Sequence, residues 1–209
     1  MDSFTPCCTN QRPSARLWLC LLGLLLLAGL ARAQVGTEIS QLHLERSEDE
    51  WQLSAQLQFE LPSVVEDALL KGVPMVFVAS ADVLRERWYW SDKKVLSTER
   101  QMRLAYQALT RRWRLNVSSG QAAASSGVGL ALNQSYDTLA QALSAIKRIA
   151  KWRVAEASDL DPAARYKLDF RFRLDLGQLP RPFQIGTLGQ SDWDIAASAL
   201  LPMVSESSK

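Results

Sequence analysis

The sequence predicts an α+β fold in which antiparallel β-structure dominates: a two-sheet, sandwich-like core of about seven strands with two helices. Three observations support this prediction. Several segments alternate strictly between apolar and polar residues, two shorter segments have the apolar spacing of helices, and one long segment changes its apolar phase midway.

The first predicted elements are two strands and a helix. Residues 51–60 alternate, with mostly apolar side chains at odd positions and polar ones at even positions, which is typical of a half-buried antiparallel strand. Residues 37–46 are the expected partner strand, joined through a polar turn. A short helix follows, which begins at Pro62 or Ser63, carries acidic residues in its first turns and ends at Gly72.

Residues 73–90 and 94–117 form the longest predicted pair of strands. With Asp92 and Lys93 as the turn, Trp90 faces Val95 and the hairpin acquires one apolar face. On that face the pairs are Val83 with Met102, Ala81 with Leu104, Ala79 with Tyr106, and Phe77 with Ala108.

The same register also pairs charged residues. Asp82 faces Arg103 on the other side of the hairpin, which would form an ion pair. Like charges meet nearer the turn, so we expect a bulge or twist there. These unfavourable pairs are Arg85 with Arg100 and Glu86 with Glu99.

The returning segment changes its apolar phase. Its apolar residues occupy even positions from 102 to 108 and odd positions from 109 to 117. A strand that exchanges its buried face midway is typically bent and can pass from one sheet to another. This phase change is the main reason to predict two sheets.

The C-terminal half supplies the second helix and two more strands. Residues 118–129 are expected to be a flexible connector. The spacing predicts a helix over 136–152, capped by Asp137, with an apolar stripe of Leu139, Leu143, Ile146 and either Ile149 or Ala150. Residues 165–176 alternate strictly and predict a strand, whereas 192–201 fit either a last strand or a helix.

Residues 1–33 have the layout of a secretory signal peptide. Arginines precede an uncharged run of fifteen residues, 17–31, and the sequence ARA at 31–33 places small residues where a signal peptidase reads. The run is shorter than the roughly 20 residues of a membrane span. We therefore predict cleavage after Ala33, which leaves 34–209 as a single exported, β-rich domain in the periplasm. Retention as an uncleaved anchor is the alternative.

Charge and cysteine content restrict the function of the exported domain. The signal contains all three cysteines, three of the 24 basic residues and one of the 22 acidic residues, so the remainder has no cysteine and 21 charges of each sign. Disulfides and thiolate metal sites are therefore excluded from it. An exported protein without disulfides fits the bacterial periplasm. A neutral domain lacks the basic surface that nucleic acids require, so no nucleic-acid partner is predicted.

No catalytic residue, metal site or cofactor is predicted. His43, the one histidine, lies in a predicted strand without a paired acid. The motifs DLDP at 159–162 and SDWD at 191–194 each hold two acids, but they lack the length and glycine of a calcium loop, so loop acids or helix caps are the simpler interpretation. Neither GxSxG nor a glycine-rich phosphate loop is present. Paired carboxylates for hydrolysis are set by space rather than by sequence, which keeps an envelope hydrolase as an alternative.

The segment RERWYWSDKK is the candidate binding site. Its aromatic and basic side chains could form a platform for a sugar, a lipid headgroup or a peptide. The residues of this platform are Arg85, Arg87, Trp88, Tyr89 and Trp90. The favoured interpretation is nevertheless that Trp88 and Trp90 share a face and pack on a neighbouring element, with arginine stems covering their rings, because aromatic residues at a hairpin tip ordinarily serve packing.

Five segments together resemble an uncharacterised family of exported proteobacterial proteins, domain of unknown function 4390. They occur in order between Leu69 and Gly186: LLKGVPMVF, RERWYWSDKK, RLAYQALTRRWRL, YDTLAQALSAI and LDLGQLPRPFQI. The resemblance implies a bacterial protein with a signal peptide, often encoded beside a nitrogen-regulation-type sensor kinase. It brings no catalytic residues.

Together these features predict an exported periplasmic protein that acts as a non-catalytic binding or interaction module, as an accessory to a membrane sensor kinase. Its partner would be an unidentified protein or envelope ligand. Membrane contact is expected only if the signal is retained, and no oligomeric state is predicted. The alternatives are an envelope hydrolase that uses carboxylates and, with a retained signal, a membrane-tethered structural domain.

Overall fold

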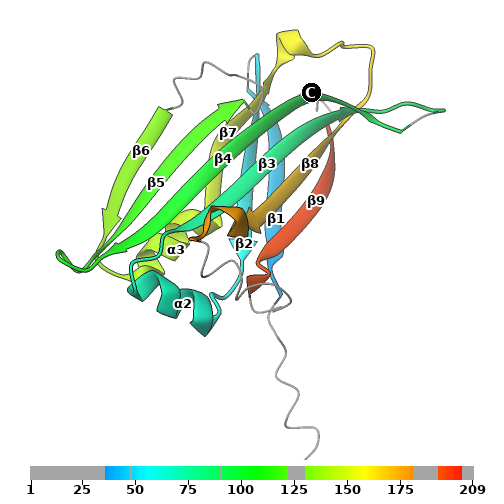
Figure 1. Ribbon diagram of the computed structural model, residues 1–209. Coiled ribbons are helices and arrows are strands. Elements are labelled where there is room, and N and C mark those ends of the chain that lie inside the picture. The colour runs from blue at the N-terminus through cyan, green and yellow to red at the C-terminus, as the bar shows by residue number, and fades with distance from the viewer. Residues whose placement is uncertain (1–35, 48, 90, 122–129, 181–192, 204–209) are drawn as a thin grey trace, which may run out of the picture. The chain divides into compact units, whose positions relative to one another are not determined.

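The computed structural model describes residues 36–47, 49–89, 91–121, 130–180 and 193–203. The chain divides into two units, of which Gly36–Lys209 is the larger. Within its described residues, the larger unit contains two α-helices and nine strands in two antiparallel sheets (Figure 1). The predicted fold class is therefore confirmed, with nine strands in place of about seven.

The smaller sheet has the strand order β1-β2-β7. Its strands are β1 (Glu38–Ser47), β2 (Glu50–Gln58) and β7 (Arg148–Glu156). Both predicted N-terminal strands are confirmed, and they pair antiparallel as expected. The alternation of β2 turns one face into the core, where Trp51, Leu53, Ala55 and Leu57 are buried.

The larger sheet has the strand order β6-β5-β4-β3-β8-β9, and all its pairs are antiparallel. Its bounds are β3 (Met75–Arg85), β4 (Lys93–Gln107), β5 (Arg112–Gln121), β6 (Leu130–Tyr136), β8 (Tyr166–Leu174) and β9 (Ala196–Met203). The strictly alternating segment 165–176 is confirmed as β8. The last segment, for which a strand or a helix was expected, contributes β9.

The core lies between the inner faces of the two sheets. Three phenylalanines meet at its centre, because the Phe172 ring centroid lies 5.5 Å from that of Phe59 and 5.9 Å from that of Phe77. Leu53 and Leu57 of β2 are fully buried against the larger sheet's apolar face. Burial of this apolar surface is the main source of stability for a domain without disulfides.

Helix α2 (Ser63–Leu70) was predicted correctly in position and end. It buries Val65, Ala68 and Leu69. Gly72 follows with a φ of +85°, a left-handed conformation that favours glycine and ends the helix. The chain then enters β3, so α2 lies at the start of that strand, away from the strand's C-terminal end (Figure 1).

Helix α3 (Leu139–Lys147) is shorter than the predicted helix and has a different cap. The Thr138 side chain accepts a hydrogen bond from the Gln141 amide at 3.3 Å, whereas the Asp137 carboxylate forms an ion pair with Arg112 at 3.0 Å. The cap prediction was therefore wrong. The residues after Lys147 continue as strand β7 rather than as helix.

The register of the long hairpin differs from the prediction. Phe77 lies opposite Met102 and Val83 opposite Leu96, so β4 is displaced by six residues. Asp82 consequently faces Ser97 rather than Arg103. A register shift does occur, between Val83 and Leu84, but the like-charge pairs that motivated the predicted bulge do not form.

The predicted bent strand over 94–117 is two strands. Residues 108–111 form a turn, in which Arg111 has a φ of +52°, and β4 and β5 pair within the same sheet. The phase change therefore marks a reversal of the chain rather than a passage between sheets. Of the predicted connector 118–129, residues 118–121 belong to β5, and 122–129 lie outside the described residues.

Candidate functional site

The candidate site lies at the tip of the β3–β4 hairpin. Pairing ends where Arg85 meets Lys93 on one side and Tyr166 of β8 on the other. Residues 86–92 connect the strands beyond that point, and we call them the hairpin tip. Of the five residues predicted for the platform, Arg85, Arg87, Trp88 and Tyr89 lie at or next to the tip. The fifth, Trp90, lies outside the described residues.

The two described aromatic side chains of the tip face solvent. Trp88 is 93% exposed and Tyr89 is 69% exposed. Their ring centroids lie 5.0 Å apart in an edge-to-face arrangement, so each ring is the other's aromatic neighbour. The interpretation that Trp88 packs on a neighbouring element is therefore wrong. Both side chains are exposed, as a platform would require, and their role in binding stays a prediction.

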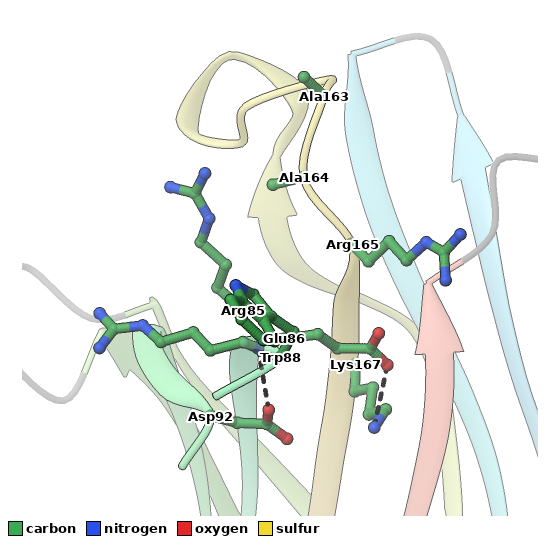
Figure 2. Close-up of a pocket in the computed structure, with 9 residues that line it drawn as sticks. Arg85, Glu86, Trp88, Asp92, Ala163, Ala164, Arg165 and Lys167 are labelled. Carbon is green, nitrogen blue, oxygen red and sulfur yellow. Dashed lines mark hydrogen bonds and ion pairs between the residues drawn. The ribbon is translucent and has the colours of Figure 1, made fainter. Parts of the chain in front are cut away.

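A surface pocket of about 430 Å³ lies beside Trp88. One wall comes from the hairpin, and the other comes from the segment that leads into β8 (Figure 2). Four basic and two acidic side chains contribute to it, so its electrostatic balance is positive. The lining residues are Arg85, Glu86, Arg87, Trp88, Asp92, Ala163, Ala164, Arg165 and Lys167.

Hydrogen bonds fix the base of the tip to β8. Glu86 forms an ion pair with Lys167, with Nζ and Oε1 2.9 Å apart (Figure 2). The backbone N–H of Glu86 also donates a hydrogen bond to the carbonyl of Arg165 at 2.9 Å. The hydrogen bond to Glu86, together with the negative charge of that carboxylate, raises the pKa of Lys167 above its ordinary value. Arg85 pairs with Asp161 at 3.2 Å on the other side.

Three cationic side chains around the tip have no carboxylate partner within the part of the chain that the structure describes. They are Arg87, Lys93 and Arg165, and all three are exposed. The Arg165 side chain is directed to the opposite side of the pocket from Arg85 (Figure 2). The tip therefore carries two exposed aromatic rings, and the three unpaired cations outnumber the one remaining carboxylate, Asp92, which suits a ligand that is both apolar and anionic.

His43 and Asp161, which the structure describes, lie in different settings. His43 is exposed on β1, opposite Ser54 of β2. The Asp161 carboxylate accepts a hydrogen bond from the Ala163 N–H at 3.0 Å and forms an ion pair with Arg85, so it holds the loop in place. Asp192 of the second acidic motif lies outside the described residues. Among those residues that are described, no group of three metal-ligating side chains occurs.

One carboxylate pair that the sequence did not single out does come together. Asp82 of β3 lies directly opposite Asp169 of β8, and both are buried. Each has its own cation: Lys94 Nζ lies 2.7 Å from Asp82 Oδ2, and Arg171 pairs with Asp169. This compensation gives the pair a structural role at the outer face of the sheet. The pair was not predicted because β3 and β8 are far apart in the sequence and their pairing was not expected.

A family model, described as a domain of unknown function, matches residues 34–200. The chain belongs to the family domain of unknown function 4390. This confirms the resemblance seen in the sequence. No curated protein and no solved structure gives a match to this member of the family.

The described part of this family member contains no helix that is both long enough and apolar enough to cross a membrane.

Proposed function

We propose that this member of the family is an exported binding module of the bacterial periplasm, and that the hairpin tip is its binding surface. The observation that carries the proposal is the exposure of Trp88, at 93%, beside the exposed Tyr89. Large aromatic side chains dominate binding energy when a partner covers them, and leaving them in water is unfavourable without such a partner. The layout of residues 1–33 supports export.

A non-catalytic role agrees with the way the acidic groups are held. The buried pair of Asp82 and Asp169 is compensated by cations, and Glu86 in the pocket is paired with Lys167. The resemblance suggests the class of partner, a membrane sensor kinase. The domain would act as its accessory on the outer side of the inner membrane.

A photo-crosslinking amino acid at position 88 tests this function in intact cells. Position 109 is the matched control, because Leu109 is fully exposed in the turn between β4 and β5. We expect a specific cross-linked product from position 88 that is absent from position 109. Identical patterns from both positions, or no product from position 88, would contradict a binding role for the tip.

A further inference from the structure

We propose that the hairpin tip docks on an anionic lipid surface, an inference that rests on the proposed binding role of the tip and names its ligand. The first observation is the concentration of exposed apolar surface. Among the described residues, seven large hydrophobic side chains are exposed, and three of them lie in this hairpin: Trp88, Tyr89 and Val95. Such clustering on a soluble domain marks an interaction site.

The second observation is the chemical type of the exposed residues. Tryptophan and tyrosine combine an apolar ring with a polar N–H or O–H group, and both are enriched where a bilayer meets water. Trp88 and Tyr89 occupy neighbouring positions at the tip, with their rings in contact. They can therefore enter the headgroup region together and keep their polar atoms hydrated.

The third observation is the charge around the rings. Arg87, Lys93 and Arg165 are exposed and lack carboxylate partners within the described ranges. The nearby carboxylate of Glu86 is already paired with Lys167. Asp92 is the other carboxylate of the tip, and its Oδ1 accepts a hydrogen bond from the Arg87 backbone N–H at 3.4 Å. Three unpaired cations against this one carboxylate leave the surface that a bilayer would meet positive, and each basic side chain near an anionic membrane strengthens binding about fivefold.

The position of the tip favours a lipid surface over a folded protein. The tip extends past the last pairs that Arg85 makes with β4 and β8 (Figure 1). A projecting tip can enter a fluid headgroup layer directly, whereas a protein partner would need a pocket shaped to receive it. Combined apolar insertion and basic attraction is also what reversible membrane binding requires.

Vesicle binding tests this inference with the protein as the cell exports it. The probes are vesicles of phosphatidylcholine with and without phosphatidylglycerol, and binding is measured by sedimentation. We expect binding to the anionic vesicles alone. The R87Q/K93Q variant should bind about 25-fold more weakly, because two attractions are lost. The W88A/Y89A variant should also lose binding.

Two control variants match these changes. R103Q/R114Q alters the charge equally at exposed residues of the outer sheet face, and L109A shortens the exposed apolar side chain of the other turn. Both should bind as the unchanged protein does. A local readout separates the tip from residues 1–33: brominated phosphatidylglycerol should quench tryptophan fluorescence, and W88F should remove part of that quenching.

The outcomes separate the inference from the function on which it rests. Equal vesicle binding by tip variants and controls, with quenching unaffected by W88F, would overturn the lipid inference. Full competition by free glycerol phosphate would also overturn it, because the ligand would then be a soluble anion. If vesicles are not bound but position 88 still cross-links a protein specifically, the binding module stands and its ligand is that protein.

Discussion

Because the tip is exposed, its aromatic side chains should contribute little to the free energy of unfolding. Trp88→Ala should leave the free energy of unfolding nearly unchanged, whereas Trp152→Ala should lower it strongly. A fully covered tryptophan buries about 250 Å². Because Trp88 is 93% exposed, it buries only about 20 Å², worth about 0.5 kcal/mol. Trp152 is 2% exposed and packs under the Arg100 guanidinium, 5.0 Å from the ring centroid, so its truncation should cost about 3–5 kcal/mol.

Thermal unfolding followed by circular dichroism measures both effects. For a domain of this size, 1 kcal/mol lowers the melting temperature by about 2–4 °C. Trp152→Ala should therefore lower it by at least about 6 °C, and Trp88→Ala by at most about 2 °C. A loss for Trp88→Ala as large as that for Trp152→Ala would mean that the tip packs on the domain. The binding proposals would then lose their main observation.

Three further predictions concern charge and processing. Lys94→Met should lower the free energy of unfolding, measured by urea denaturation, by about 1.5–3 kcal/mol, because buried Asp82 loses its cation. The double variant Lys94→Met/Asp82→Asn should recover most of this loss. Since pairing with Glu86 raises the pKa of Lys167, this ion pair stabilises the fold below the ordinary pKa of 10.5 and is lost as pH rises through the raised value. The melting temperature of Lys167→Met should therefore lie below that of the unchanged protein at neutral pH, and the difference should shrink as the pH rises from 10.5 through the raised pKa of Lys167. The intact mass of the exported protein should correspond to a chain cleaved after Ala33; a full-length mass would favour the membrane-tethered alternative.

The alternation of apolar and polar residues predicted the strands that have one solvent-exposed face. In β2 and β8, every second residue is buried and most of the intervening ones contact solvent, so the period of two is visible in the sequence. Strand β7 was not predicted because its alternation of buried and exposed residues is interrupted. Lys151 has a φ of +45°, and the register with β2 shifts nearby. Buried Ile149 and Trp152 are thereby three residues apart, a spacing that resembles a helix.

The register error in the hairpin has a different physical cause. Side chains alternate with a period of two, so a slip of one residue exchanges the faces but a slip of six restores them. Both registers bury the odd residues of β3 and the even residues of β4. The apolar pattern therefore identified the correct faces and could not choose the correct partners. Strand β3 also pairs with β8, which is distant in sequence, and this third strand contributes to the choice between the two registers of β3 and β4.

The register is also what creates the candidate site. In the predicted hairpin, a turn at Asp92 and Lys93 would have kept Trp88 within the paired strands. In the observed register, pairing ends at Arg85 and the seven residues 86–92 project beyond it. The sequence thus located the aromatic and basic residues of the site but predicted the wrong environment for Trp88. Its exposure follows from strand pairing over the whole sheet, which places an amphipathic, positively charged tip in solvent at one end of β3.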